Sequence, residues 1–122
     1  MPLADQAHAR RSERFRVDAG GFLVRAVIPR RGSPYEHRCA LDSLQRVCHR
    51  FDERGERGEG GGHTVESLAA DTAVPVTQAA TAVAFLRERG IVTTSQRRSH
   101  AATADVYLDA MIEYHALREL GA

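Results

Sequence analysis

Residues 64–92 read TVESLAADTAVPVTQAATAVAFLRERGIV, and this stretch decides the fold that we expect. Thr64 can cap the start of a helix, and the apolar residues that follow it recur at helical spacing. Pro75 disfavours helical backbone at the residue before it, but it suits the first turn of a new helix. Gly90 is the residue type that commonly ends a helix. The stretch therefore predicts a short helix, a tight turn, and a longer helix over residues 75–89.

The chain before this stretch predicts a hairpin, a helix and a loop. Residues 15–28 are strand-like on both sides of a turn at residues 18–21, which predicts a β-hairpin ended by Pro29. Residues 35–53 place apolar side chains at helical spacing, so we expect a helix there. Residues 55–62 contain five glycines. Because glycine stabilises neither helix nor strand, they predict a flexible loop.

The chain after Gly90 predicts a second hairpin. Residues 91–95 are strongly strand-like, residues 96–98 form a polar tip, and residues 99–103 can return as a second strand. Two helices joined by a tight turn and followed by a β-hairpin make a winged helix-turn-helix.

Two segments carry a resemblance to this fold. Residues 64–75 resemble the first helix and the turn of a winged helix-turn-helix, and residues 85–92 resemble the end of its recognition helix running into the wing. The junction between the recognition helix and the wing, at residues 85–92, is similar to that of MarR-like and ArsR-like bacterial regulators. The resemblance covers about residues 35–120. We therefore expect a mainly α-helical protein with a small β component. Residues 1–33 would form a basic arm and hairpin, and residues 34–122 the winged-helix domain.

The resemblance implies that the helix over residues 75–89 enters the major groove of double-stranded DNA. On a helical wheel its apolar face holds Val76, Ala79, Ala80, Val83 and Leu86. The opposite face holds Thr77, Gln78, Thr81, Phe85 and Glu88. Glutamine can pair with adenine, and threonine can contact a base or the thymine methyl group. The resemblance thus makes Thr77, Gln78 and Thr81 the candidates for base contacts. It makes Arg97 and Arg98, at the wing tip, candidates for phosphate or minor-groove contacts.

The charge is unevenly placed along the chain. All 17 basic residues are arginine, and the net charge is +1. Residues 1–57 hold twelve arginines against eight acidic residues, whereas residues 58–122 hold five against eight. The densest basic stretch runs from Arg10 to Arg31. One interpretation is an electrostatic contact with phosphates that includes Arg30 and Arg31; the other is a solvated, arginine-rich tail.

Length and composition exclude several classes of protein. A chain of 122 residues that is 43% hydrophobic and 27% charged has the size and make-up of one domain with a real core. It lacks a run of 18 apolar residues and a secretory signal, so we expect a cytoplasmic protein without a membrane partner. We find no nucleotide, zinc-protease or Ser–His–Asp fingerprint, and therefore expect neither an enzyme nor a cofactor.

Two cysteines and two histidines lie close together in the sequence, at His37, Cys39, Cys48 and His49. If residues 39–49 are helical, the two cysteines lie on opposite faces and ~13 Å apart along the axis. That distance is too long for one metal ion or a disulfide, so we expect no metal site. Cys48 fits a core residue, whereas Cys39 remains a candidate for a redox-sensing thiol.

Residues 104–120 predict a last helix with two apolar surfaces. The broad stripe includes Tyr114, and the smaller patch holds Leu108 and Ile112. A second surface favours a symmetric dimer, although a deeply buried helix is the alternative. The outward position of Phe85 indicates packing under the first hairpin or a protein partner. The expected function is therefore a dimeric, DNA-binding transcriptional regulator. The alternative is a winged-helix interaction module that holds a protein partner and does not bind DNA.

Overall fold

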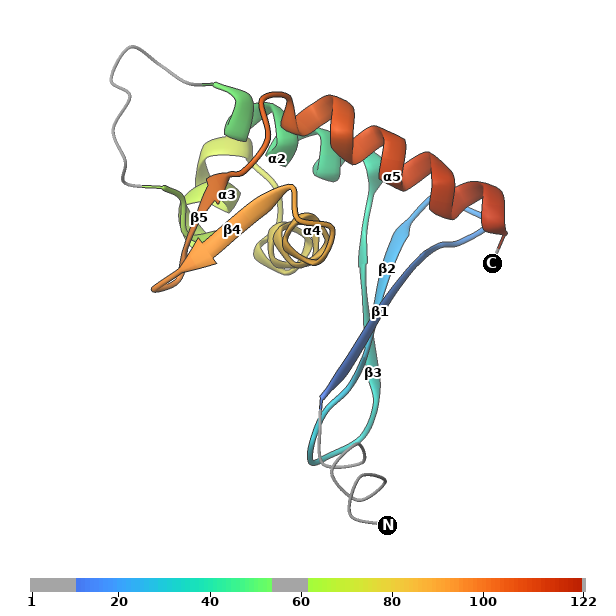
Figure 1. The fold of residues 1–122 in the computed structure, drawn as a ribbon. Helices are drawn as coiled ribbons and strands as arrows, with labels where there is room; N and C mark the ends of the chain where they lie inside the picture. Colours follow the sequence, from blue (N-terminus) through green and yellow to red (C-terminus); the bar gives the residue numbers. More distant parts are fainter. Residues whose placement is uncertain (1–10, 54–61, 122) are drawn as a thin grey trace.

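The computed structural model describes residues 11–53 and 62–121, which form a mixed α/β arrangement of four helices and two small antiparallel sheets (Figure 1). In chain order the elements are β1 (Ser12–Val17), β2 (Leu23–Ile28), β3 (Tyr35–Cys39), α2 (Leu41–Asp52), α3 (Val65–Thr72), α4 (Val76–Glu88), β4 (Val92–Ser95), β5 (Arg98–Ala101) and α5 (Val106–Leu120). Arg10 and most of the predicted glycine loop lie outside the described residues.

The first sheet has the strand order β1-β2-β3 and confirms the predicted hairpin. Asp18 shapes the turn of this hairpin, because its carboxylate accepts hydrogen bonds from the backbone N–H groups of Gly20 and Phe22. The third strand, β3, was not predicted. The helix expected over residues 35–53 begins only at Leu41, because Tyr35–Cys39 pair antiparallel with β2 and Ala40 is the cap residue of α2.

The β1–β3 sheet is anchored in the core at one end, and its other end extends away from α2 and α5 (Figure 1). At the anchored end the paired residues Val17, Leu23 and Cys39 are all buried in the core. Further out, charged side chains bridge the strands through the ion pairs Arg16–Glu36 and Arg25–Glu13. Opposite charges on neighbouring strands of a sheet stabilise the pairing of those strands.

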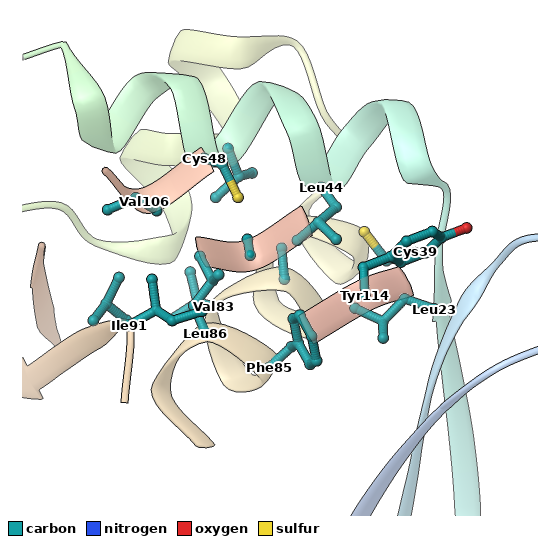
Figure 2. Close-up of a cluster of buried hydrophobic side chains, with 14 of the residues drawn as sticks. Leu23, Cys39, Leu44, Cys48, Val83, Phe85, Leu86, Ile91, Val106 and Tyr114 are labelled. Carbon is teal, nitrogen blue, oxygen red and sulfur yellow. The ribbon is translucent and has the colours of Figure 1, made fainter. Parts of the chain in front are cut away.

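The helices share a main hydrophobic core, in which side chains of α4 meet those of α2 and α5 (Figure 2). Helix α4 packs against α2, α3, β3 and β4, and α2 also packs against α5. The largest fully buried side chains of this core include Tyr114, Phe85, Leu44, Leu68 and Leu86. Because partners press on most of its circumference, α4 is the central element of the molecule.

The predicted boundaries around α3 and α4 have clear local causes. Thr64 and Ser67 cap α3 reciprocally, each side chain accepting a hydrogen bond from the other's backbone N–H. Ala73 ends α3 in the left-handed conformation, with φ 57° and ψ 37°. Pro75 then caps α4, and Gly90 follows that helix with φ 75°. These features confirm the predicted helix, turn and helix.

The second hairpin is also confirmed, with its strands at β4 and β5. Its two-residue turn consists of Gln96 and Arg97, which both have positive φ. That backbone matches the type I′ turn, whose twist suits a two-residue hairpin. His63 forms an antiparallel bridge with Ser99 of β5, which links the hairpin to the segment directly before α3.

Two long-range contacts fix α5. Both carboxylate oxygens of Asp52, at the end of α2, accept hydrogen bonds from the backbone of α5, at 2.8 Å from Val106 and 2.9 Å from Tyr107. Near the other end of the helix, the Tyr114 hydroxyl donates a 2.6 Å hydrogen bond to the carbonyl of Gly21. These contacts tie the last helix to α2 and to the first hairpin.

Candidate functional site

The exposed side of α4 differs from the prediction. Thr81 and Phe85, which the helical wheel placed outward, are fully buried, so Thr81 is not accessible for a base contact. Val76, which the wheel placed inward, is 53% exposed. The surface that the helix presents is therefore rotated relative to the predicted polar face.

The β1–β3 sheet is the physical cause of this rotation. It packs along α4, and the ring of Phe15 meets the ring of Phe85 edge-on at a centroid distance of 5.5 Å. The Thr81 hydroxyl donates to the carbonyl of Thr77 at 2.9 Å, so its burial leaves no unsatisfied polar group. Packing under the first hairpin, one of the two interpretations of Phe85, is confirmed. The other interpretation, that Phe85 contacts a protein partner, is wrong because its side chain is fully buried.

Gln78 is partly engaged inside the molecule. Its side-chain oxygen accepts a hydrogen bond from the backbone N–H of Ala40 at 3.0 Å. This bond joins α4 to the start of α2, where the cap residue Ala40 offers no side-chain oxygen of its own. Bidentate pairing of Gln78 with an adenine would require breaking it.

The remaining side of α4 is open to solvent. Val76, Thr77, Arg87 and Glu88 are exposed there, and Ala80 is half-buried between them. This side faces away from α2 and α5, between the β4–β5 hairpin and the outer half of the β1–β3 sheet (Figure 1). Of the three residues predicted for base contacts, Thr77 alone presents a free, exposed side chain.

The β4–β5 hairpin carries positive charge at its tip. Arg97 lies in the turn with its side chain 83% exposed, and its shortest ion-pair distance is 3.8 Å, to Glu66. Arg98 follows as the first residue of β5 and is also exposed. Both residues thus lie where the sequence placed them.

The outer end of the β1–β3 sheet forms a second positive tip. Arg30 and Arg31 lie in the β2–β3 connection and are exposed, as are Arg11 and Arg14 on β1 or directly before it. Arg11, Arg14 and Arg31 make no ion pair with another described residue. Both basic tips lie away from α2 and α5, the β4–β5 tip at the left of the view and the outer end of the β1–β3 sheet at the bottom (Figure 1).

Helix α5 presents part of its predicted second surface. Leu108 and Ile112, one turn apart, are 52% and 58% exposed. Tyr114 is fully buried, with its hydroxyl bonded to Gly21, so its assignment to a partner interface is wrong. Leu108 and Ile112 therefore remain as the apolar patch of this helix.

The cysteines are core residues. Cys39 ends β3 outside any helix, and both thiols are free and buried. Burial raises the pKa of Cys39 to about 12, and it raises the pKa of Cys48 as well. A thiol held in its neutral form is a poor nucleophile, which contradicts the redox-sensing interpretation of Cys39. Within residues 11–53 and 62–121, no three potential metal ligands come together.

The comparisons with known proteins add no assignment. No family model, curated protein sequence or solved structure matches this chain. Among the described helices, none combines the length and apolar character that crossing a membrane requires. The candidate site therefore rests on its own geometry, namely the exposed side of α4 and the two basic tips.

Sequence reasoning missed three residues of this site. Val76 looked like a core residue because it is apolar, and Arg87 lay outside the predicted polar face. Arg11 belonged to the basic stretch, but its place near the β2–β3 connection, which carries Arg31, follows only from the pairing of Ser12 with Ile28.

Proposed function

We propose that this chain is a winged helix-turn-helix protein that binds double-stranded DNA and regulates transcription in the cytoplasm of a bacterium. The order α2, α3, tight turn, α4 and β4–β5 hairpin supports this architecture, because the fold requires a second helix that is presented beside a β wing. In this assignment α4 is the recognition helix and the β4–β5 hairpin is the wing.

One observation carries the proposal: the open side of α4 lies between two arginine-bearing β projections, both of which extend away from α2 and α5 (Figure 1). Arginine is the side chain best suited to phosphate oxygens, because its planar guanidinium can donate two parallel hydrogen bonds. A helix flanked by such tips can enter a major groove while the tips contact the backbones on either side. Arg97 and Arg98 would act at one tip, and Arg30 and Arg31 at the other.

The turn of the wing allows a test that separates charge from folding. Gln96 and Arg97 both occupy positive φ, where glycine is favoured. Arg97→Gly therefore removes a guanidinium while relieving the turn, and Gln96→Gly relieves the same turn with the guanidinium retained. We expect Arg97→Gly to weaken binding to duplex DNA and to lower the salt slope of the binding constant by about 0.9, the value for one phosphate contact.

The measurement is fluorescence anisotropy of labelled duplexes over a series of salt concentrations. Gln96→Gly should bind like the unmodified chain. If the full chain binds no duplex even at low salt, or if both glycine variants bind with the unmodified slope, the proposed phosphate contact at the wing is wrong.

A second surface favours self-association. The patch of Leu108 and Ile112 is exposed on α5, a helix that lies away from the two basic tips (Figure 1). Two exposed aliphatic side chains one helical turn apart can pack against the same residues of a second copy. We propose that the regulator is a homodimer through α5. The alternative, a module that holds a different protein at this patch, predicts a monomer in isolation.

A further inference from the structure

We infer that the first turns of α4 read thymine through its methyl group, with Val76 as the specificity-determining residue. This inference rests on the proposed function, because it requires α4 to lie in a major groove. It arises from which side chains the fold leaves available there, and Val76 was not among the residues that the sequence pointed to.

Hydrogen-bonding readout is restricted in this part of α4. The Gln78 side-chain oxygen already accepts from Ala40, and the Thr81 hydroxyl is buried and donates to Thr77. A site that reads a base by hydrogen bonds needs free donors or acceptors aimed outward. The N-terminal half of α4 offers the hydroxyl of the exposed Thr77 and, from the half-buried Gln78, the amide nitrogen alone.

Methyl groups dominate what remains. Val76 is 53% exposed, Thr77 carries a methyl beside its hydroxyl, and Ala80 lies one turn further along the same side. These residues stand at the N-terminal end of the helix, which is the part that contacts base edges in helix-turn-helix proteins. Thymine is the one base that presents a methyl group in the major groove, so an apolar contact there selects thymine.

The arrangement also explains why an exposed valine is compatible with a polar interface. The arginines of the two tips supply attraction to phosphates without regard to sequence. Burying an aliphatic side chain between them is favourable when the group that displaces water from it is itself apolar. Affinity and sequence preference would thus come from different parts of the molecule.

The test uses deoxyuridine, which differs from thymidine in duplex DNA only by the missing methyl group. Duplexes that the full chain retains from a random-sequence pool are resynthesised with each thymine replaced in turn by uracil. We expect at least one replacement to weaken binding by about fourfold, the value of one buried methyl group. Val76→Ala should bind the thymine and uracil forms of that duplex alike.

A matched control is Leu120→Ala, which removes an exposed aliphatic side chain at the end of α5. It should retain the full preference for thymine over uracil. Salt-dependent binding that no uracil replacement weakens would overturn this inference and leave DNA binding intact. A thymine preference that persists unchanged in Val76→Ala would overturn the role of Val76. Failure to bind any duplex would overturn the proposed function and the inference together.

Discussion

Ala73 adopts a strained left-handed backbone conformation in the turn between α3 and α4. Its left-handed backbone costs a residue with a Cβ atom roughly 1–2 kcal/mol. We expect Ala73→Gly to raise the free energy of unfolding by about 0.5–1 kcal/mol, because the relief of strain exceeds the added freedom of glycine in the unfolded chain. Urea unfolding followed by circular dichroism measures the change.

The control for this prediction is Ala70→Gly, an exposed position inside α3. There glycine should lower the free energy of unfolding by about 1 kcal/mol, since the backbone is already helical. Equal losses in both variants would contradict the account of the turn.

The two buried thiols make stability depend on alkaline pH. The pKa of Cys39 is raised from 9.0 to about 12, and that of Cys48 is raised too, because burial disfavours the thiolate. Above pH 9 the unfolded chain releases both protons while the folded chain keeps them. The free energy of unfolding should therefore fall as pH rises from 9 towards 12, by up to about 1.4 kcal/mol per pH unit for each thiol.

Urea unfolding at several pH values in this window tests the linkage. Cys48→Ala should lower stability at every pH but flatten its decline. A decline as steep as in the unmodified chain would mean that other groups cause it.

At the scale of residues, the sequence predicted many core positions correctly. It did not predict which residues on the polar face of α4 are exposed to solvent. Leu44, Phe51 and Leu86 are apolar and buried, as their spacing predicted. Thr81 is polar and also buried, because a hydroxyl can satisfy itself on the preceding helical turn. This internal hydrogen bond has no signal in the sequence, so the sequence could not show that Thr81 is buried while Thr77 is exposed.

At the scale of elements, Asp52 acts as a cap supplied by a neighbouring helix. Its carboxylate accepts from two of the first N–H groups of α5, which have no partner within their own helix. Asp52→Ala should lower the free energy of unfolding by about 1–3 kcal/mol, because two charge-assisted hydrogen bonds disappear together. Thermal and urea unfolding would each report the loss.

Asp109→Asn is the matched change, since Asp109 lies in the first turn of α5 and makes no side-chain hydrogen bond with another described residue. It should alter stability by less than about 0.5 kcal/mol. If Asp52→Ala is equally mild, the bridge between α2 and α5 does not contribute as the geometry indicates.

The elements that the sequence predicted well are those with local signals. Thr64, Pro75 and Gly90 each act within a few residues, so the boundaries of α3 and α4 follow from them. Strand β3 has no such signal, because residues 35–39 become a strand through pairing with β2. Since the β1–β3 sheet determines which side of α4 is covered, the missed strand and the misplaced face of α4 are one error.

At the scale of the whole molecule, the apolar patch on α5 predicts the oligomeric state. The unmodified chain should sediment as a dimer, and the double variant Leu108→Asp with Ile112→Asp as a monomer, because charges on both sides of the contact repel. Analytical ultracentrifugation measures the mass, and circular dichroism checks that the variant keeps its fold. The same mass for both proteins would remove the dimer from the proposal.

The sequence predicted the arginines of the candidate site but not how the two tips that carry them are arranged around α4. Local sequence placed Arg97 and Arg98 at a hairpin tip, and the charge pattern pointed to Arg30 and Arg31. That the two tips flank the open side of α4 depends on how the β1–β3 sheet and the β4–β5 hairpin dock on the same helix. Such docking is a property of the packed core and has no short-range signature.

The bond between Tyr114 and Gly21 joins residues 93 positions apart. On the ribosome, the first hairpin is therefore made long before the helix that anchors its turn. Until then its apolar residues, Val17 and Leu23, lack their final cover. A nascent chain that stalls before residue 114 would expose the hydrophobic surface of this hairpin, and chaperones bind exposed hydrophobic surface. The turn of the first hairpin can gain this contact only after Tyr114 has been synthesised.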